Sequence, residues 1–229
     1  TSTINSGLAL AFKQQFEESW NNFTIEPQID TVNGIYLITR AEELAWVATN
    51  ISTLTANTIK FTSNIDLTGR YWTPFDVPSN VTVDGSGFTI SNLFTKNNGG
   101  FVNINNGTIK HIVISSSVIY SSGINALDNI GLITNSNNGL IENIMITSAT
   151  LNLNNIASIS ATNNFGGIVG SSTGTISYSY FTGNIYINNY VSAVNSAFNI
   201  GTITGAITGN AQILESYAYS NIYNFYQGT

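Results

Sequence analysis

Few side chains in this sequence could do acid–base or metal chemistry. His111 is the single histidine, Lys110 precedes it, and there is no cysteine. Histidine titrates near neutral pH and is the usual proton shuttle in proteins, so Lys110 and His111 together could provide a general base. Zinc sites built from thiolates or from two or three imidazoles are excluded, because those ligands do not exist in the chain.

Three aspartates, Asp66, Asp76 and Asp84, could form a carboxylate cluster for calcium or for glycoside hydrolysis. Asp84 opens an Asp-Gly-Ser-Gly turn, where an aspartate bonds its own backbone, and Asp66 lies in a similar turn. The spacing of these acids does not follow that of a calcium-binding loop. We therefore expect turn aspartates, no metal, no cofactor and no catalytic residue.

Aromatic side chains form the most suggestive cluster for binding. Outward tyrosines offer a flat apolar ring with a hydroxyl, which suits stacking on sugars or forming a protein interface. Packing and recognition remain equally open interpretations of this cluster. The candidate assembly or ligand surface consists of Tyr178, Tyr180, Tyr186, Tyr190, Tyr223, Phe225 and Tyr226.

Four Asn-x-Ser/Thr motifs are possible glycosylation sites, at Asn22, Asn50, Asn80 and Asn106. The chain has 33 asparagines and abundant serine and threonine, so chance accounts for such motifs.

The composition indicates a globular domain with a neutral surface. Only 8% of the 229 residues are charged, whereas soluble domains carry about 25%. The 12 acidic and 6 basic residues give a net charge of −6, and no basic cluster offers a footprint for nucleic acid. No apolar run is long enough for a transmembrane segment.

An internal repeat organises the residues described above. Gly107, Gly139 and Gly174 each begin a Gly-x-Ile triplet, at spacings of 32 and 35 residues. Each triplet precedes an alternating pair that we expect to face inward. With Leu214 aligned to Ile176 in the last unit, these pairs are Ile112 and Ile114, Ile144 and Ile146, Ser179 and Phe181, and Tyr217 and Tyr219. This frame places His111 in a polar position with Asn143, Tyr178 and Ser216.

Each unit contains three strand-sized runs bounded by Gly, Asn and Ser, which cannot bury a face alone but can do so when the units stack. Each unit opens with a glycine, among them Gly131, Gly167 and Gly201. We expect an all-β fold: a β-solenoid, or β-helix, with a short N-terminal α-helical cap. Residues 1–50 would form the cap and leader, and residues 51–229 the repeats. The approximate units are 87–99, 100–130, 131–166, 167–200 and 201–229, with polar segments 121–129, 154–164 and 188–199 between them.

The N-terminal part differs in pattern and in charge. Leu8, Phe12, Phe16 and Trp20 recur every four residues, which predicts an amphipathic helix. A second short helix is expected at 41–49, where two glutamates fall in the first turn and favour the positive end of the helix dipole.

The chain resembles the GLUG-motif β-helix repeats of bacterial surface and adhesin-like proteins over roughly residues 35–225. The most specific part is the leader, with Ile-Asp-Leu-Thr-Gly from Ile65, Trp-Thr-Pro from Trp72 and Val-Asp-Gly-Ser-Gly from Val83. Gly167 and Gly170 keep both glycines of the short motif, whereas the other units lose the second. The resemblance implies an extracellular, repeat-built module without catalysis.

The last segment, 221–229, is aromatic, uncharged and uncapped, so we expect it to meet another surface. The function expected is a non-enzymatic extracellular structural protein, a subunit of a surface or filament assembly. Its partners would be copies of itself or adjoining domains of a surface protein. The alternative is an adhesin that holds a glycan or host protein. A polysaccharide lyase or pectin hydrolase is the third hypothesis, which the scarcity of charge disfavours.

Overall fold

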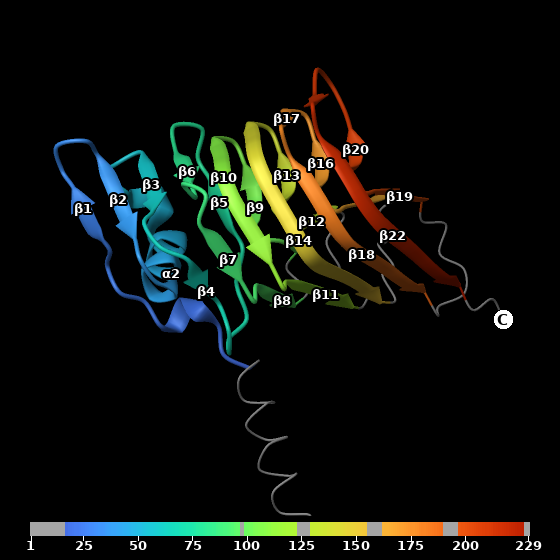
Figure 1. Cartoon of the computed structure of the whole chain (residues 1–229), viewed down its shortest axis with the longest axis horizontal. Coiled ribbons are helices and arrows are strands. Elements are labelled where there is room, and N and C mark those ends of the chain that lie inside the picture. Colours follow the sequence, from blue (N-terminus) through green and yellow to red (C-terminus); the bar gives the residue numbers. More distant parts are fainter. Residues whose placement is uncertain (1–16, 97–98, 123–128, 155–161, 190–196, 227–229) are drawn as a thin grey trace, which may run out of the picture.

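The computed structural model describes residues 17–96, 99–122, 129–154, 162–189 and 197–226. Within these residues the chain is mostly strand, and every strand pair is parallel except β1 (Gln28–Asp30) with β2 (Ile35–Ile38). The predicted all-β class is confirmed, and the helix predicted at 41–49 is α2 (Ala41–Asn50). Short 3-10 turns are η1 (Trp20–Asn22) and η2 (Ile51–Thr53). Figure 1 shows the strands side by side, following the sequence from one end of the molecule to the other.

The largest sheet has 14 strands and begins at β1, upstream of residue 51. Its strands after β2 are β3 (Thr58–Phe61), β4 (Ile65–Asp66), β6 (Thr82–Asp84), β7 (Thr89–Ser91), β8 (Phe94–Lys96), β10 (Thr108–Ser115), β11 (Val118–Ser122), β14 (Leu140–Asn154), β17 (Thr175–Ser177), β18 (Tyr180–Asn189), β21 (Gln212–Leu214) and β22 (Tyr217–Tyr226).

Two smaller sheets carry the remaining strands of the described residues. One has the order β20-β16-β13-β9-β5 and the other β12-β15-β19. Their bounds are β5 (Phe75–Val77), β9 (Val102–Asn105), β13 (Thr134–Asn137), β16 (Val169–Ser172), β20 (Thr204–Ile207), β12 (Asn129–Gly131), β15 (Thr162–Gly166) and β19 (Ala197–Gly201).

Strands pair with their equivalents one repeat away. Ile109 pairs with Ile141, Ile141 with Ile176, and Ile176 with Ile213, at offsets of 32, 35 and 37 residues. The first two offsets are the spacings predicted from the glycines. Ile109, Ile141 and Ile176 are fully buried, so each segment covers the aliphatic row of its neighbour.

The predicted frame is wrong by one residue in the last segment. Ile213, and not Leu214, pairs with Ile176, and Leu214 is 46% exposed. Tyr217 and Tyr219 therefore lie on the outer face, 66% and 80% exposed, instead of inside. Successive strand residues point to opposite faces, so a slip of one residue exchanges every inward and outward side chain.

In one unit, the opening glycine also lies one position earlier than predicted. Gly131 pairs with Gly166, and Gly166 with Gly201. Gly166, rather than Gly167, is thus the equivalent of Gly131. Because Gly166 and Gly167 are adjacent, residue type alone could not show which of them aligns with Gly131.

One continuous hydrophobic core runs through the described residues. Its first part is aromatic: Trp72, fully buried, stacks on Phe101 with ring centroids 5.5 Å apart, and Phe75 meets Phe101 edge-on at 5.6 Å. The indole N–H of Trp72 donates to the Phe101 carbonyl oxygen at 2.7 Å, which satisfies its buried polar atom. Farther along, the core is aliphatic. Ile112 is fully buried, and its partner Ile144 in the next segment is almost fully buried.

Helix α2 contributes to the core at the first end of this stack. Leu44, Ala45 and Val47 are fully buried in the core cluster that also holds Trp72. The helix start is anchored by Glu43, whose carboxylate accepts from the Thr39 amide at 2.7 Å and the Thr39 hydroxyl at 2.8 Å. These contacts resemble a capping box, in which an acid in the first helical turn bonds back to the preceding chain.

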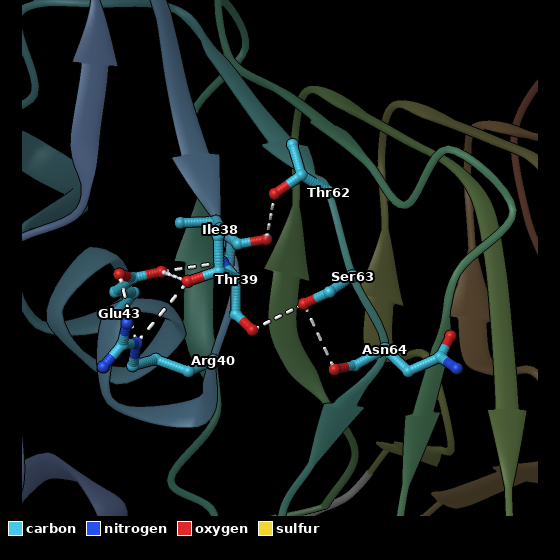
Figure 2. Close-up of polar contacts among 7 residues, drawn as sticks. All are labelled: Ile38, Thr39, Arg40, Glu43, Thr62, Ser63 and Asn64. Carbon is cyan, nitrogen blue, oxygen red and sulfur yellow. Dashed lines mark hydrogen bonds and ion pairs between the residues drawn. The ribbon is translucent and has the colours of Figure 1, made fainter.

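Figure 2 shows how this helix start joins the strand that follows. The Thr62 hydroxyl donates to the Ile38 carbonyl at 3.2 Å, and the Ser63 hydroxyl donates to the Thr39 carbonyl. The segment before α2 is thereby tied to the segment after β3, 24 residues later in the chain.

Two predicted features fall largely outside the described residues. The amphipathic helix predicted at 8–20 lies mostly in residues 1–16. Its described last residues are not helical, since Ser19 forms an isolated parallel bridge with Tyr71 before the 3-10 turn η1. Most of the polar segments between the units also lie outside the described residues.

Candidate functional site

The pairing of β10 with β6 places Lys110 and His111 beside Asp84. Lys110 pairs with Asp84, and the Asp84 carboxylate lies 3.1 Å from His111 Nδ1 and 3.8 Å from Lys110 Nζ. The same carboxylate accepts from the Ser86 amide at 2.8 Å, so the prediction of a turn aspartate is confirmed. Asp84 is 19% exposed in its side chain. The imidazole and the ammonium thus help to hold this turn against the next segment.

The contacts of Asp84 make stability depend on pH. Burial raises the pKa of Asp84, but the Ser86 amide, the His111 hydrogen bond and the charges of His111 and Lys110 outweigh it and lower the pKa below its ordinary value. A carboxylate with a depressed pKa stabilises the fold above its unfolded pKa of about 3.9, and this contribution is lost as the pH falls through the folded pKa.

We expect Asp84→Asn to lower the free energy of unfolding by about 1 kcal/mol at pH 6, and by progressively less as the pH falls below about 3.9 and through the folded pKa. Urea titrations followed by circular dichroism at several pH values measure this. Glu26→Gln, a change at an exposed acid outside this turn, controls for the loss of one charge. An Asp84→Asn deficit of the same size at every pH would contradict the assignment.

The other two aspartates lie at separate places, Asp66 at the end of β4 and Asp76 within β5. Asp66 accepts from the Thr68 amide at 3.0 Å and the Asn92 side chain at 2.9 Å, and Asp76 accepts from the Asn103 side chain at 2.9 Å. Within the part of the chain that the structure describes, no three His, Asp or Glu side chains form a group suited to a metal ion. The three aspartates act on neighbouring backbone and amide groups.

A bend in the large sheet carries one non-glycine residue with positive φ in each of four segments. These residues are His111, Asn143, Tyr178 and Glu215, with φ of 54°, 53°, 49° and 44°. Register makes them equivalent, so Glu215 rather than Ser216 corresponds to His111, as the slip in the last segment requires. We call these four residues the bend column.

The structure divides the predicted tyrosine surface between two places. Tyr178, in the bend column, is 52% exposed, and Tyr180 lies two residues farther along with its ring centroid 4.6 Å from that of Tyr217. Tyr186 stacks on Tyr223 at 4.8 Å with an interplanar angle of 9°.

Three predicted surface residues have no described side chain. Tyr190 lies outside the described residues. Phe225 and Tyr226 belong to β22, in register with Asn188 and Asn189, but their side chains also lie outside the described part.

Tyr178, Tyr180 and Tyr217 border a groove of about 380 Å³ on the outer face, which we call the tyrosine groove. It lies between the bend column and the next outward row, with Ile144 in its floor. The other lining side chains, which the sequence alone did not single out, are Asn143, Met145 and Glu215. Met145 is 44% exposed.

The last segment leaves its apolar side chains uncovered. Ile185 is fully buried, whereas Ile222, its equivalent one repeat later, is 42% exposed, and Ile207 is 50% exposed. Among the described residues, β22 pairs only with β18 and β20 only with β16. The outer edges of these strands therefore have no described strand beside them. We call this surface the open end.

The possible glycosylation sites lie in different surroundings. Asn22, Asn80 and Asn106 are exposed. The Asn50 amide donates to the Trp46 carbonyl at 2.8 Å within α2, and that of Asn80 donates to Asn57 at 3.2 Å. A glycan at Asn50 would displace a hydrogen bond inside the helix.

A buried asparagine ladder, which the sequence analysis missed, crosses one of the smaller sheets. The Asn105 amide donates to Asn137 Oδ1 at 2.8 Å, and the Asn137 amide donates to the Ser172 hydroxyl at 3.1 Å. Both asparagines are fully buried. The available signal was Asn-Asn-Gly, repeated 32 residues apart before Gly107 and Gly139.

The chain matches no protein family, no curated protein and no solved structure. Among the helices of the described residues, none has the length and apolar character needed to span a bilayer.

Proposed function

We propose that this chain is a β-solenoid that serves as a non-enzymatic structural subunit of an extracellular or cell-surface assembly. Parallel pairing at offsets of 32, 35 and 37 residues supports successive coils, and α2 would cap the first one. This proposal places the chain with the GLUG-motif repeats of bacterial surface proteins.

The open end is the observation that carries the assembly function. Ile207 and Ile222 belong to rows that are covered elsewhere by the next segment, and solenoids need a cap or a partner at such a position. The opposite edge is the three-residue strand β1, and short edge strands limit pairing.

A second copy of the chain is the partner that fits this surface. Its apolar side chains, and its strand edges that have no described strand beside them, match those of an equivalent surface by both packing and hydrogen bonding. Glu215 is the only charged residue after residue 200, so like surfaces meet with little repulsion.

Sedimentation velocity and electron microscopy test the assembly. We expect the wild-type chain to form oligomers and Ile222→Lys to be monomeric, because an ammonium group at the open end would lose its hydration. Val118→Lys is the matched control, since Val118 is 39% exposed on an outer row away from the open end, and it should still assemble. A monomeric wild-type chain, or an Ile222→Lys chain that assembles normally, would overturn the proposal.

Glycan binding is the second candidate function, and the tyrosine groove is the observation that favours it. Aromatic rings beside unpaired polar groups are the usual means of holding a sugar, which presents an apolar ring face and a rim of hydroxyls. Under this function the solenoid would be the scaffold of an adhesin.

A further inference from the structure

The polar groups that line the tyrosine groove have no partners in the described protein. Neither the Glu215 carboxylate, the Asn143 amide nor the Tyr178 hydroxyl makes a hydrogen bond or ion pair with a described residue. Asparagines elsewhere on the outer surface bond to one another between segments, as Asn138 does with Asn106 at 2.9 Å. Asn143 cannot do this, because its neighbours in the bend column are His111 and Tyr178.

The groove also exposes apolar area on its outward row. Met145, Tyr180 and Tyr217 form one row across three segments, and Val113 occupies the same row one segment earlier. Tyr217 is 66% and Met145 44% exposed. Three segments at a strand spacing of about 4.8 Å span roughly 10 Å, the length of one to two linked pyranose rings.

We propose that the tyrosine groove binds neutral sugar residues of a polysaccharide that runs along the stacking direction. This inference rests on the second candidate function and names its site and ligand class. The rings of Tyr178 and Tyr217 would face the apolar side of a pyranose. Glu215 would accept hydrogen bonds from sugar hydroxyls, and the Asn143 amide could both donate and accept.

Charge selects neutral sugars over acidic ones. Glu215 is the charged side chain that lines the groove. The chain as a whole carries a net charge of −6. A uronate or sialate in the groove would therefore meet like charge, whereas a neutral hexose would meet acceptors for its hydroxyls.

Affinity electrophoresis in gels containing mannan, galactan, dextran or polygalacturonate tests this proposal. We expect at least one neutral polysaccharide to retard the wild-type chain and polygalacturonate not to retard it. Tyr178→Ala should weaken binding roughly ten-fold, because it removes an aromatic stacking surface. Tyr178→Phe keeps the ring and should lose less.

Tyr186→Ala is the matched control, because it removes one tyrosine of the other stacked pair, outside the groove. It should bind as the wild type does. Failure of all neutral polysaccharides to bind, binding of polygalacturonate alone, or equal losses in Tyr178→Ala and Tyr186→Ala would overturn the inference. Equal losses would still leave glycan binding at another place. Sedimentation of the same samples reports self-assembly independently.

Discussion

Gly139→Ala is expected to destabilise the protein by roughly 3 kcal/mol, at the upper end of the cost of overpacking. A Cβ atom at this position would lie 2.0 Å from the Gly107 carbonyl oxygen, and the obstacle is backbone of the preceding segment. Gly174 has the same relation to Gly139, at 2.1 Å. The methyl group would therefore push neighbouring segments apart. Urea unfolding followed by circular dichroism measures the loss.

Gly87→Ala is the control for this substitution. Gly87 has φ of +83° and no neighbouring atom within 4 Å of an added Cβ. Its replacement should cost only the left-handed backbone penalty of about 1 kcal/mol. If Gly139→Ala were no more costly than Gly87→Ala, the close approach between segments would not exist as described.

Asn137→Ala is expected to cost about 3 kcal/mol, because it removes the centre of a buried ladder and leaves polar partners without bonds. Asn137 accepts from Asn105 and donates to Ser172, and its amide also lies 3.3 Å from the carbonyl oxygens of Gly139 and Thr175. The bonds with Asn105 and Ser172 are buried, and the contacts with Gly139 and Thr175 are partly buried. Chemical denaturation again provides the measurement.

The neighbouring substitution Asn138→Ala shows whether burial is the cause. Asn138 is exposed and bonds Asn106 at 2.9 Å on the outer surface. Its loss should cost no more than about 0.5 kcal/mol, as for most surface changes. Equal effects of the two substitutions would mean that the ladder adds nothing beyond an ordinary surface contact.

The sequence predicts the stacking best where the repeat is regular. The triplets at Gly107, Gly139 and Gly174 set two offsets correctly, and their aliphatic rows are buried as expected. The last offset is longer, and both Ile213 and Leu214 are apolar. Hydrophobicity alone therefore could not choose between two registers, and the wrong choice exchanged inside and outside.

Buried asparagines escaped prediction for a different physical reason. Asparagine is mostly an exposed residue. Because the chain contains 33 asparagines, residue type alone does not identify the buried ones. Only the alignment of strands shows that Asn105 and Asn137 satisfy each other's side chains inside the sheet.

The candidate site was partly predictable. Tyr178 and Tyr180 were singled out by residue type, and both line the groove. Asn143, Met145 and Glu215 were not, because they become neighbours only through pairing across offsets of 35 and 37 residues. Residues so far apart in sequence give no local signal.

The bend column gives the molecule an interchangeable display row. An imidazole, an amide, a phenol and a carboxylate occupy the same backbone position in consecutive segments. In the first three of these segments the flanking rows of Ile109 and Ile112 are fully or almost fully buried, whichever side chain is present. The side chain at this position can therefore differ from one segment to the next while the same buried rows lie beneath it.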